Sequence, residues 1–131
     1  MGTAPGPQLL TVEEFLARNA DERVELIRGS VVEKASPSGE RSRAQGGIGW
    51  RVGHKFDRKP GGRWPGGWWF LIELDLRFGQ EILRPDVCGF RRERLQQPPT
   101  GRPIAIAPDW VCEILAPSNA KTDRPRPVPS G

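Results

Sequence analysis

Two short runs in the C-terminal half of the chain constrain its fold more than any other feature. Residues 82–88 (Ile-Leu-Arg-Pro-Asp-Val-Cys) and 109–115 (Asp-Trp-Val-Cys-Glu-Ile-Leu) are apolar and strand-forming, and each carries an acidic side chain inside it, Asp86 and Glu113. An acidic group in an apolar strand is costly unless it is paired, hydrogen-bonded or bound to a metal ion. Two such acids on neighbouring strands could place four carboxylate oxygens around one cation. The alternative is that both acids lie on a solvated face of the sheet.

The charge of the chain is unevenly distributed. Its 131 residues are enough for one domain with a buried core, and 16 Gly and 14 Pro predict long irregular stretches. Residues 1–40 carry 4 basic and 7 acidic side chains, whereas residues 41–131 carry 16 basic and 9 acidic ones. A basic region around an acidic pair suits a polyanionic partner such as nucleic acid, although many basic proteins have no such partner.

The sequence contains no segment typical of export or membrane insertion. No run approaches the roughly 20 apolar residues of a membrane span, and the first residues lack both the basic and the apolar part of a signal peptide. We therefore expect a cytoplasmic protein. Cys88 and Cys112 do not have the spacing of a metal site, and in such a chain they are expected to be buried, reduced thiols.

The N-terminal third predicts a helix followed by a hairpin. Thr11 and Glu14 have the spacing of a capping box, which would begin a short amphipathic helix over 11–19. Residues 23–33 form two strand-like runs separated by Arg28-Gly29, the pattern of a β-hairpin. Glu25 lies among apolar residues of the first run, where an acid is more often salt-bridged than catalytic.

The middle of the chain predicts a second helix and a second hairpin. An apolar residue at every fourth position over 40–56 favours a helix in spite of four glycines. Residues 68–78 alternate between apolar and charged side chains and predict one continuous strand. Gly79-Gln80 then turns the chain into a strand over 82–90, so we expect an antiparallel hairpin. The basic connection 91–108 is either a solvated loop or a phosphate-contacting loop beside the acidic pair.

Taken in order and spacing, these segments resemble the Uma-two family of restriction endonucleases, within the PD-(D/E)XK nuclease superfamily. The resemblance runs from about Leu10 to Arg124 and is carried by residues 11–16, 24–29, 84–87 and 108–118. It implies an α/β restriction-endonuclease-like core, a mixed and mainly antiparallel sheet flanked by helices. We expect this domain over 10–118, with a flexible lead-in over 1–9 and a disordered proline-rich tail over 119–131.

The resemblance also implies a metal site. In such nucleases the Asp of the PD motif, the Glu of the following strand and a backbone carbonyl hold a divalent cation. The matching groups here are Asp86, Glu113 and the carbonyl of Ile114, and the implied ion is Mg²⁺ or Mn²⁺, for which oxygen is the usual ligand. Glu25 matches an early acidic position that would orient a metal-bound water. The ion would lower the pKa of an attacking water and stabilise charge on the scissile phosphate.

Two departures from the family pattern bear on activity. Leu115 stands where the superfamily motif has a lysine two residues after the Glu, and family members usually carry this lysine on a helix after the third strand. Lys121 is the only lysine near this position in the sequence, so we expect it to be the catalytic stand-in. The family's C-terminal helix and strands have no counterpart, so we expect a truncated domain with an open sheet edge that favours a homodimer.

Three functions remain open from the sequence. The first is a metal-dependent DNA endonuclease that hydrolyses phosphodiester bonds. The second is a catalytically inactive module that binds nucleic acid or a protein through a basic, Trp-rich surface, where Trp64, Trp68 and Trp69 either stack on bases or pack within the fold. The third is an unstable remnant without function.

Overall fold

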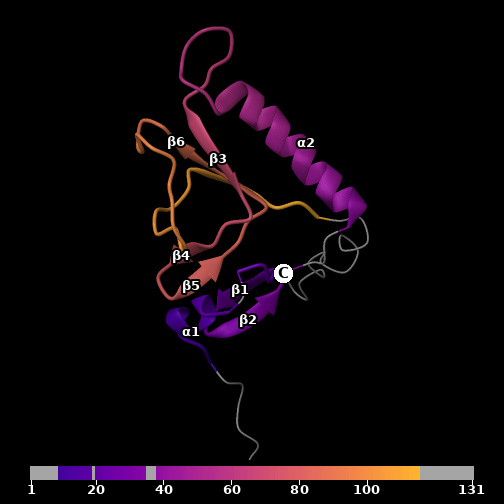
Figure 1. Ribbon diagram of the computed structural model, residues 1–131, viewed down its shortest axis with the longest axis vertical. Coiled ribbons are helices and arrows are strands. Elements are labelled where there is room, and N and C mark those ends of the chain that lie inside the picture. The colour runs from indigo at the N-terminus through magenta and orange to yellow at the C-terminus, as the bar shows by residue number, and fades with distance from the viewer. Residues whose placement is uncertain (1–8, 19, 35–37, 116–131) are drawn as a thin grey trace, which may run out of the picture.

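The computed structural model describes residues 9–18, 20–34 and 38–115 (Figure 1). The expectations for the lead-in, for the tail and for Lys121 therefore lie outside the described residues, apart from Leu9. In chain order the described elements are α1 (Val12–Leu16), β1 (Val24–Ile27), β2 (Ser30–Glu33), α2 (Gly39–Phe56), β3 (Trp68–Ile72), β4 (Leu76–Phe78), β5 (Glu81–Leu83), β6 (Val87–Arg91) and β7 (Trp110–Cys112). They form two antiparallel sheets, β2-β1-β5-β4 and β3-β6-β7.

The first sheet is packed against α1. The capping box is confirmed, because the Thr11 hydroxyl accepts from Glu14 N and the Glu14 carboxylate accepts from Thr11 N. The helix is shorter than predicted. The predicted hairpin of β1 and β2 is also confirmed, and Arg28 and Gly29 make its turn with positive φ angles of 52° and 80°. The core under this sheet consists of Val12, Phe15, Val24, Leu26 and Ile82.

The predicted continuous strand over 68–78 is wrong. The chain leaves the strand conformation at residues 73–75, where Glu73 has φ 48°, a left-handed conformation that non-glycine residues adopt uncommonly. The hairpin itself is confirmed. β3 pairs with β6 and β4 with β5 in one continuous register, and Glu73 N donates to Asp86 O at 3.3 Å between the two halves. The hairpin is therefore shared by both sheets, and Asp86 lies at the junction.

The second sheet carries α2 across one face (Figure 1). The predicted helix over 40–56 is confirmed, and it begins at the N-cap Ser38, whose hydroxyl accepts from Arg41 N. The central strand β6 is buried along Val87–Phe90. Gly89 is required there, because a Cβ atom at this position would come within 2.6 Å of the Phe70 ring. The second core consists of Leu76, Cys88, Phe90 and Ile104.

The two cysteines are free thiols. Cys88 is buried, as expected, whereas Cys112 is only half-buried. Among the described helices, none has the length and apolar character needed to cross a membrane.

Candidate functional site

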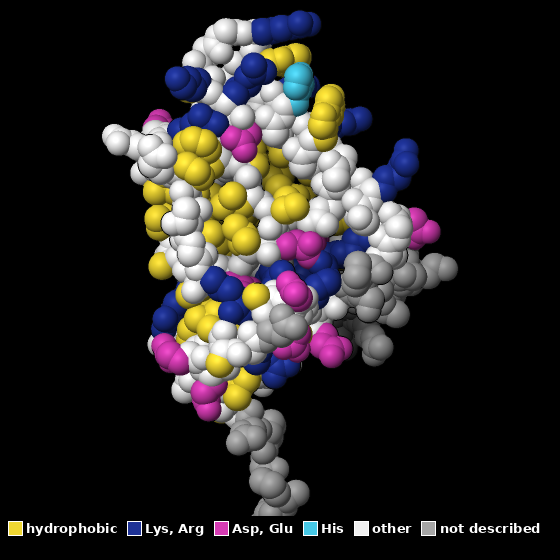
Figure 2. Space-filling view, in the orientation of Figure 1, with side chains coloured by type: hydrophobic (Ala, Val, Ile, Leu, Met, Phe, Trp, Pro, Cys, Tyr) yellow, Lys and Arg dark blue, Asp and Glu magenta, His cyan; other side chains and the backbone are white. Residues whose placement is uncertain are grey.

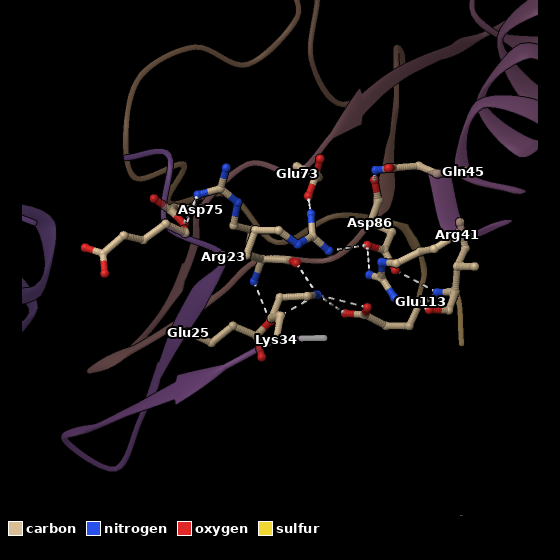
Figure 3. Close-up of polar contacts among 12 residues, drawn as sticks. Arg23, Glu25, Lys34, Arg41, Gln45, Glu73, Asp75, Asp86 and Glu113 are labelled. Carbon is tan, nitrogen blue, oxygen red and sulfur yellow. Dashed lines mark hydrogen bonds and ion pairs between the residues drawn. The ribbon is translucent and has the colours of Figure 1, made fainter. Parts of the chain in front are cut away.

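The two acids singled out by the sequence come together at one end of the second sheet. Asp86 directly precedes β6 and Glu113 directly follows β7, and the pairing of Val87 with Cys112 brings these flanking residues face to face. The backbone N–H of Ile114 donates to Asp86 Oδ2 at 2.7 Å. Asp86 is fully buried, whereas half of the Glu113 side chain is exposed. The predicted pair thus forms one site with a buried and an open side (Figure 3).

The buried carboxylate is held by the first turns of α2. The Arg41 guanidinium donates through Nη2 to Asp86 Oδ1 and through Nη1 to the Ile114 carbonyl at 2.5 Å. One turn later, Gln45 Nε2 donates to the Asp86 carbonyl at 3.0 Å. Arg41 is itself only 5% exposed. One cation therefore bridges the carboxylate and the carbonyl that the family resemblance names as metal ligands.

The open side of the site is organised by Lys34, which follows β2. Its Nζ atom lies 3.0 and 3.2 Å from the two carboxylate oxygens of Glu113 and 2.5 Å from the Arg84 carbonyl. The same atom is 3.8 Å from Glu25 Oε2, which accepts from Arg84 N at 2.6 Å. Lys34 thus joins Glu25 to Glu113, and Figure 3 shows it between them.

The interrupted segment of the hairpin adds further ion pairs. Arg23 pairs with Glu73, and its Nη2 atom lies 3.5 Å from Asp86 Oδ1. Asp75 is buried and accepts from Arg102 Nε at 2.6 Å. The break in the strand therefore turns two acidic side chains into a network with arginines rather than leaving them on a solvated face.

The two motif acids have pKa values shifted in opposite directions. Burial raises the pKa of Asp86, but the Ile114 N–H and the charges of Lys34 and Arg41 outweigh it, so this pKa is below its ordinary value. Burial raises the pKa of Glu113, and the nearby charge of Asp86 adds to the effect, which Lys34 offsets only in part. At neutral pH the more firmly ionised group is thus the buried one, which is possible because it is hydrogen-bonded and paired.

Comparison with known proteins identifies the family. A family model described as "Uma2: Putative restriction endonuclease" matches residues 9–126. The chain belongs to this family. It is similar to the crystal structure of a "putative nuclease belonging to DUF820" from Anabaena variabilis, with 27% identity and a TM-score of 0.69. The similarity covers 88% of this chain and 63% of that chain, so this chain spans less than two thirds of the length of its neighbour. No curated protein matches the chain.

This likeness confirms the predicted fold class, a mixed α/β nuclease fold with antiparallel sheets and few helices. Restriction-endonuclease-like families generally use divalent metals, and the oxygens of Asp86, Glu113 and Ile114 are suitable donors. Each of these three groups, however, already accepts a hydrogen bond from Arg41 or Lys34 through an oxygen that a metal ion would need. Within the described ranges, no group of three or more His, Cys, Asp or Glu is arranged to hold a metal ion. With both cations in place, a divalent ion does not fit among these oxygens.

Sequence reasoning missed Arg41, Gln45 and Lys34. A signal existed for the first two, because positions 41, 45, 48 and 52 follow helical spacing and extend the inward stripe of Ile48 and Val52 toward the start of the helix. Polar residues on such a stripe indicate buried partners. Lys34 carries no comparable signal, because it lies just beyond the last paired residue of β2. Leu115, which stands where the superfamily motif has its lysine, is exposed.

Proposed function

We propose that this chain acts on DNA as an endonuclease of the PD-(D/E)XK type, hydrolysing phosphodiester bonds with Asp86 and Glu113 as its acidic pair. The observation that carries the proposal is the 2.7 Å hydrogen bond from Ile114 N to Asp86, which joins the two motif acids at one end of the sheet. The description of the family and that of the solved neighbour, a nuclease in both cases, support the reaction class.

A basic and aromatic surface supports DNA as the partner. At the end of α2, Trp50 is 69% exposed and stacks on His54 with ring centroids 5.1 Å apart. Lys55 and Arg63 both lie over the Trp64 ring, at 5.5 and 5.2 Å from its centroid. We call these five residues the α2 tip. Figure 2 shows Lys and Arg side chains gathered around this end of the molecule. Such cations would contact phosphates and such rings would stack on exposed bases.

The course of α2 supports the proposal by offering a path for DNA. α2 (Figure 1) begins next to the acidic site, where its first turn carries Arg41, and leads to the α2 tip, so a DNA strand bound along the helix would connect the two. Exposed Arg43 and Arg51 lie along the same helix. The sequence interpretation that Trp64 takes part in binding is retained in this proposal. Trp68 and Trp69 are better explained by packing, because Trp68 stacks on Phe70 and Trp69 donates to a backbone carbonyl.

The remaining assignments stay predictions. Glu25 is proposed as the third acid of the site, linked through Lys34 to Glu113. Mg²⁺ or Mn²⁺ is the proposed cofactor once the carboxylates are released from their cations. Lys121 is the proposed stand-in for the lysine replaced by Leu115. A homodimer would pair through β7, which is the edge strand of its sheet among the described residues and where Val111 is 52% exposed.

A second candidate function is a DNA-binding module that does not cleave. The observation in its favour is that Arg41 and Lys34 neutralise the oxygens that a metal-dependent nuclease needs. In that case the acidic site would stabilise the fold, and the α2 tip would carry the whole function.

Nicking of supercoiled plasmid tests the proposal and separates the two candidates. The full chain is incubated with plasmid in Mg²⁺, Mn²⁺ or EDTA, together with the isosteric variants Asp86→Asn and Glu113→Gln. Glu93→Gln, an exposed acid away from the site, is the matched control. The endonuclease predicts nicking that needs metal, survives in the control and is lost in both site variants. DNA binding without nicking, unchanged by EDTA and weakened by salt, would instead establish the binding module.

A further inference from the structure

The metal-ligand atoms implied by the family are held by two cations of the chain's own N-terminal half. Arg41 holds the Asp86 carboxylate and the Ile114 carbonyl, and Lys34 holds the Glu113 carboxylate. Both cations come from segments that the sequence interpretation did not connect with the site. Each of them contacts oxygen atoms that a metal ion would need.

Arg41 has the geometry of a replacement for a metal. Its planar guanidinium reaches two oxygens from two different strand ends, a carboxylate and a backbone carbonyl, which is the kind of oxygen pair that a divalent ion would bridge. The side chain is 5% exposed, and its N-terminal position on α2 is fixed because Gln45, one turn later, binds the Asp86 carbonyl. The guanidinium is therefore a built part of the site rather than a loose surface charge.

Lys34 is in a different position. It contacts Glu113, whose side chain is half exposed, and its Nζ atom donates to the Glu113 carboxylate and to the Arg84 carbonyl. A metal bound between Asp86 and Ile114 would have to displace Arg41, whereas Lys34 could remain near Glu25. A bound metal ion should thus compete mainly with Arg41 and not with Lys34.

We propose that Arg41 is a built-in competitor of the divalent metal: its guanidinium occupies the metal position, and a metal ion binds Asp86 only when Arg41 withdraws. The proposal rests on the proposed function for the identity of the site and adds how access to that site is controlled. It predicts that the free chain binds divalent ions weakly although the acidic pair is intact. Removing the guanidinium should convert Asp86, Ile114 and Glu113 into an open oxygen site.

Direct titration with Mn²⁺ tests this. Binding of Mn²⁺ to the full chain is measured by electron paramagnetic resonance for the wild type, Arg41→Gln, the double variant Arg41→Gln/Asp86→Asn, and Lys34→Gln as the matched loss of the other cation. Arg41→Gln is expected to bind Mn²⁺ about tenfold or more tightly than the wild type, because a hydrogen bond to a charged group changes an equilibrium constant by about ten- to a hundredfold. The gain should disappear in the double variant and be smaller in Lys34→Gln.

Several outcomes would overturn the proposal. Wild type and Arg41→Gln could bind Mn²⁺ equally, whether tightly or not at all, or the gain could persist without Asp86. A wild-type measurement guards against a variant that does not fold: the guanidinium NMR signals of Arg41 are followed during titration with Mg²⁺. Metal binding at Asp86 that leaves these signals unchanged would also exclude competition. Because the readout is metal binding, a chain that fails to nick plasmid leaves this result unaffected.

Discussion

The backbone N–H of Ile114 donates to the fully buried Asp86 carboxylate at 2.7 Å, so the residue after Glu113 ties the two motif acids together. The other oxygen of Asp86 is taken by Arg41 from α2. This places a buried ion pair where two sheets and a helix meet. The arrangement has consequences for stability as well as for function.

Loss of the Arg41 charge should destabilise the protein strongly. Arg41→Gln leaves the Asp86 carboxylate buried with less compensation, and breaking a buried pair in this way costs about 3–5 kcal/mol. Arg43→Gln is the matched control, because Arg43 is exposed on the same helix, and it should change the free energy of unfolding by less than about 0.5 kcal/mol. Urea unfolding followed by circular dichroism measures both. Equal stability of the two variants would mean that the Arg41–Asp86 pair is not buried.

Gly89 should be intolerant of a side chain. A methyl group there would meet the Phe70 ring at 2.6 Å, and overpacking of this kind costs about 1–3 kcal/mol. Gly46 on α2 is the opposite case, since a Cβ atom there meets nothing within 4 Å. Gly46→Ala should stabilise the helix by up to about 1 kcal/mol. The midpoint temperature of thermal unfolding should therefore be lower for Gly89→Ala and higher for Gly46→Ala than for the wild type. A shift of the same sign in both variants would contradict the packing described.

The two cysteines should differ in reactivity. Burial raises the pKa of Cys88 to about 11, so at pH 8 almost none of it is thiolate. Cys112 is less buried, although its pKa is also raised by burial and by the charges of Asp86 and Glu113. With Ellman's reagent the native protein should react slowly, first at Cys112, and both thiols should react at once in denaturant. Rapid native labelling of Cys88, read by mass spectrometry, would show that β6 is not a stable central strand.

The α2 tip should account for part of the DNA affinity. Lys55→Gln and Arg63→Gln each remove a cation over Trp64, so each should weaken binding and lower the slope of log K against log salt by about 0.9 for each phosphate that is no longer neutralised. Arg77→Gln, a partly exposed charge on β4, is the control and should leave the slope unchanged. Fluorescence anisotropy with a labelled duplex in EDTA measures this. If all three variants weakened binding equally, the affinity would reflect overall charge and not this surface.

The sequence predicted the local elements better than the tertiary contacts between them. Thr11 with Glu14 and Arg28 with Gly29 are signals read from neighbouring residues, and both were confirmed. The alternation over 68–78 predicted one strand because side-chain pattern does not report a left-handed residue, and Glu73 breaks the strand there. Its conformation is stabilised by tertiary contacts such as the ion pair with Arg23.

The same limit applies to the candidate site. Asp86 and Glu113 were found because acids in apolar strands are conspicuous, and the register of β6 and β7 then joins them. Their cationic partners come from 45 and 79 residues away in the chain, a separation at which spacing carries no information. Lys121 stays a prediction.

The pH dependence of stability follows from the opposite pKa shifts of the two acids. Asp86 has a pKa below its ordinary value of 3.8, so its contribution to stability is full above that pH and is lost as the pH falls through the lower folded value. Glu113 has a pKa above its ordinary value of 4.5, so its ionised form favours unfolding as the pH rises from 4.5 through the higher folded value. The contribution of this pair to the free energy of unfolding should therefore be greatest in the acidic range between the two transitions, near pH 3.8 to 4.5.

Titration of the two carboxyl groups by carbon-detected NMR tests the central claim, that Asp86 and Glu113 form one coupled site, most directly. The structure predicts that Asp86 titrates below 3.8 and Glu113 above 4.5, and that Glu113→Gln shifts the titration of Asp86. Both groups titrating at their ordinary values, each unaffected by substitution of the other, would contradict it.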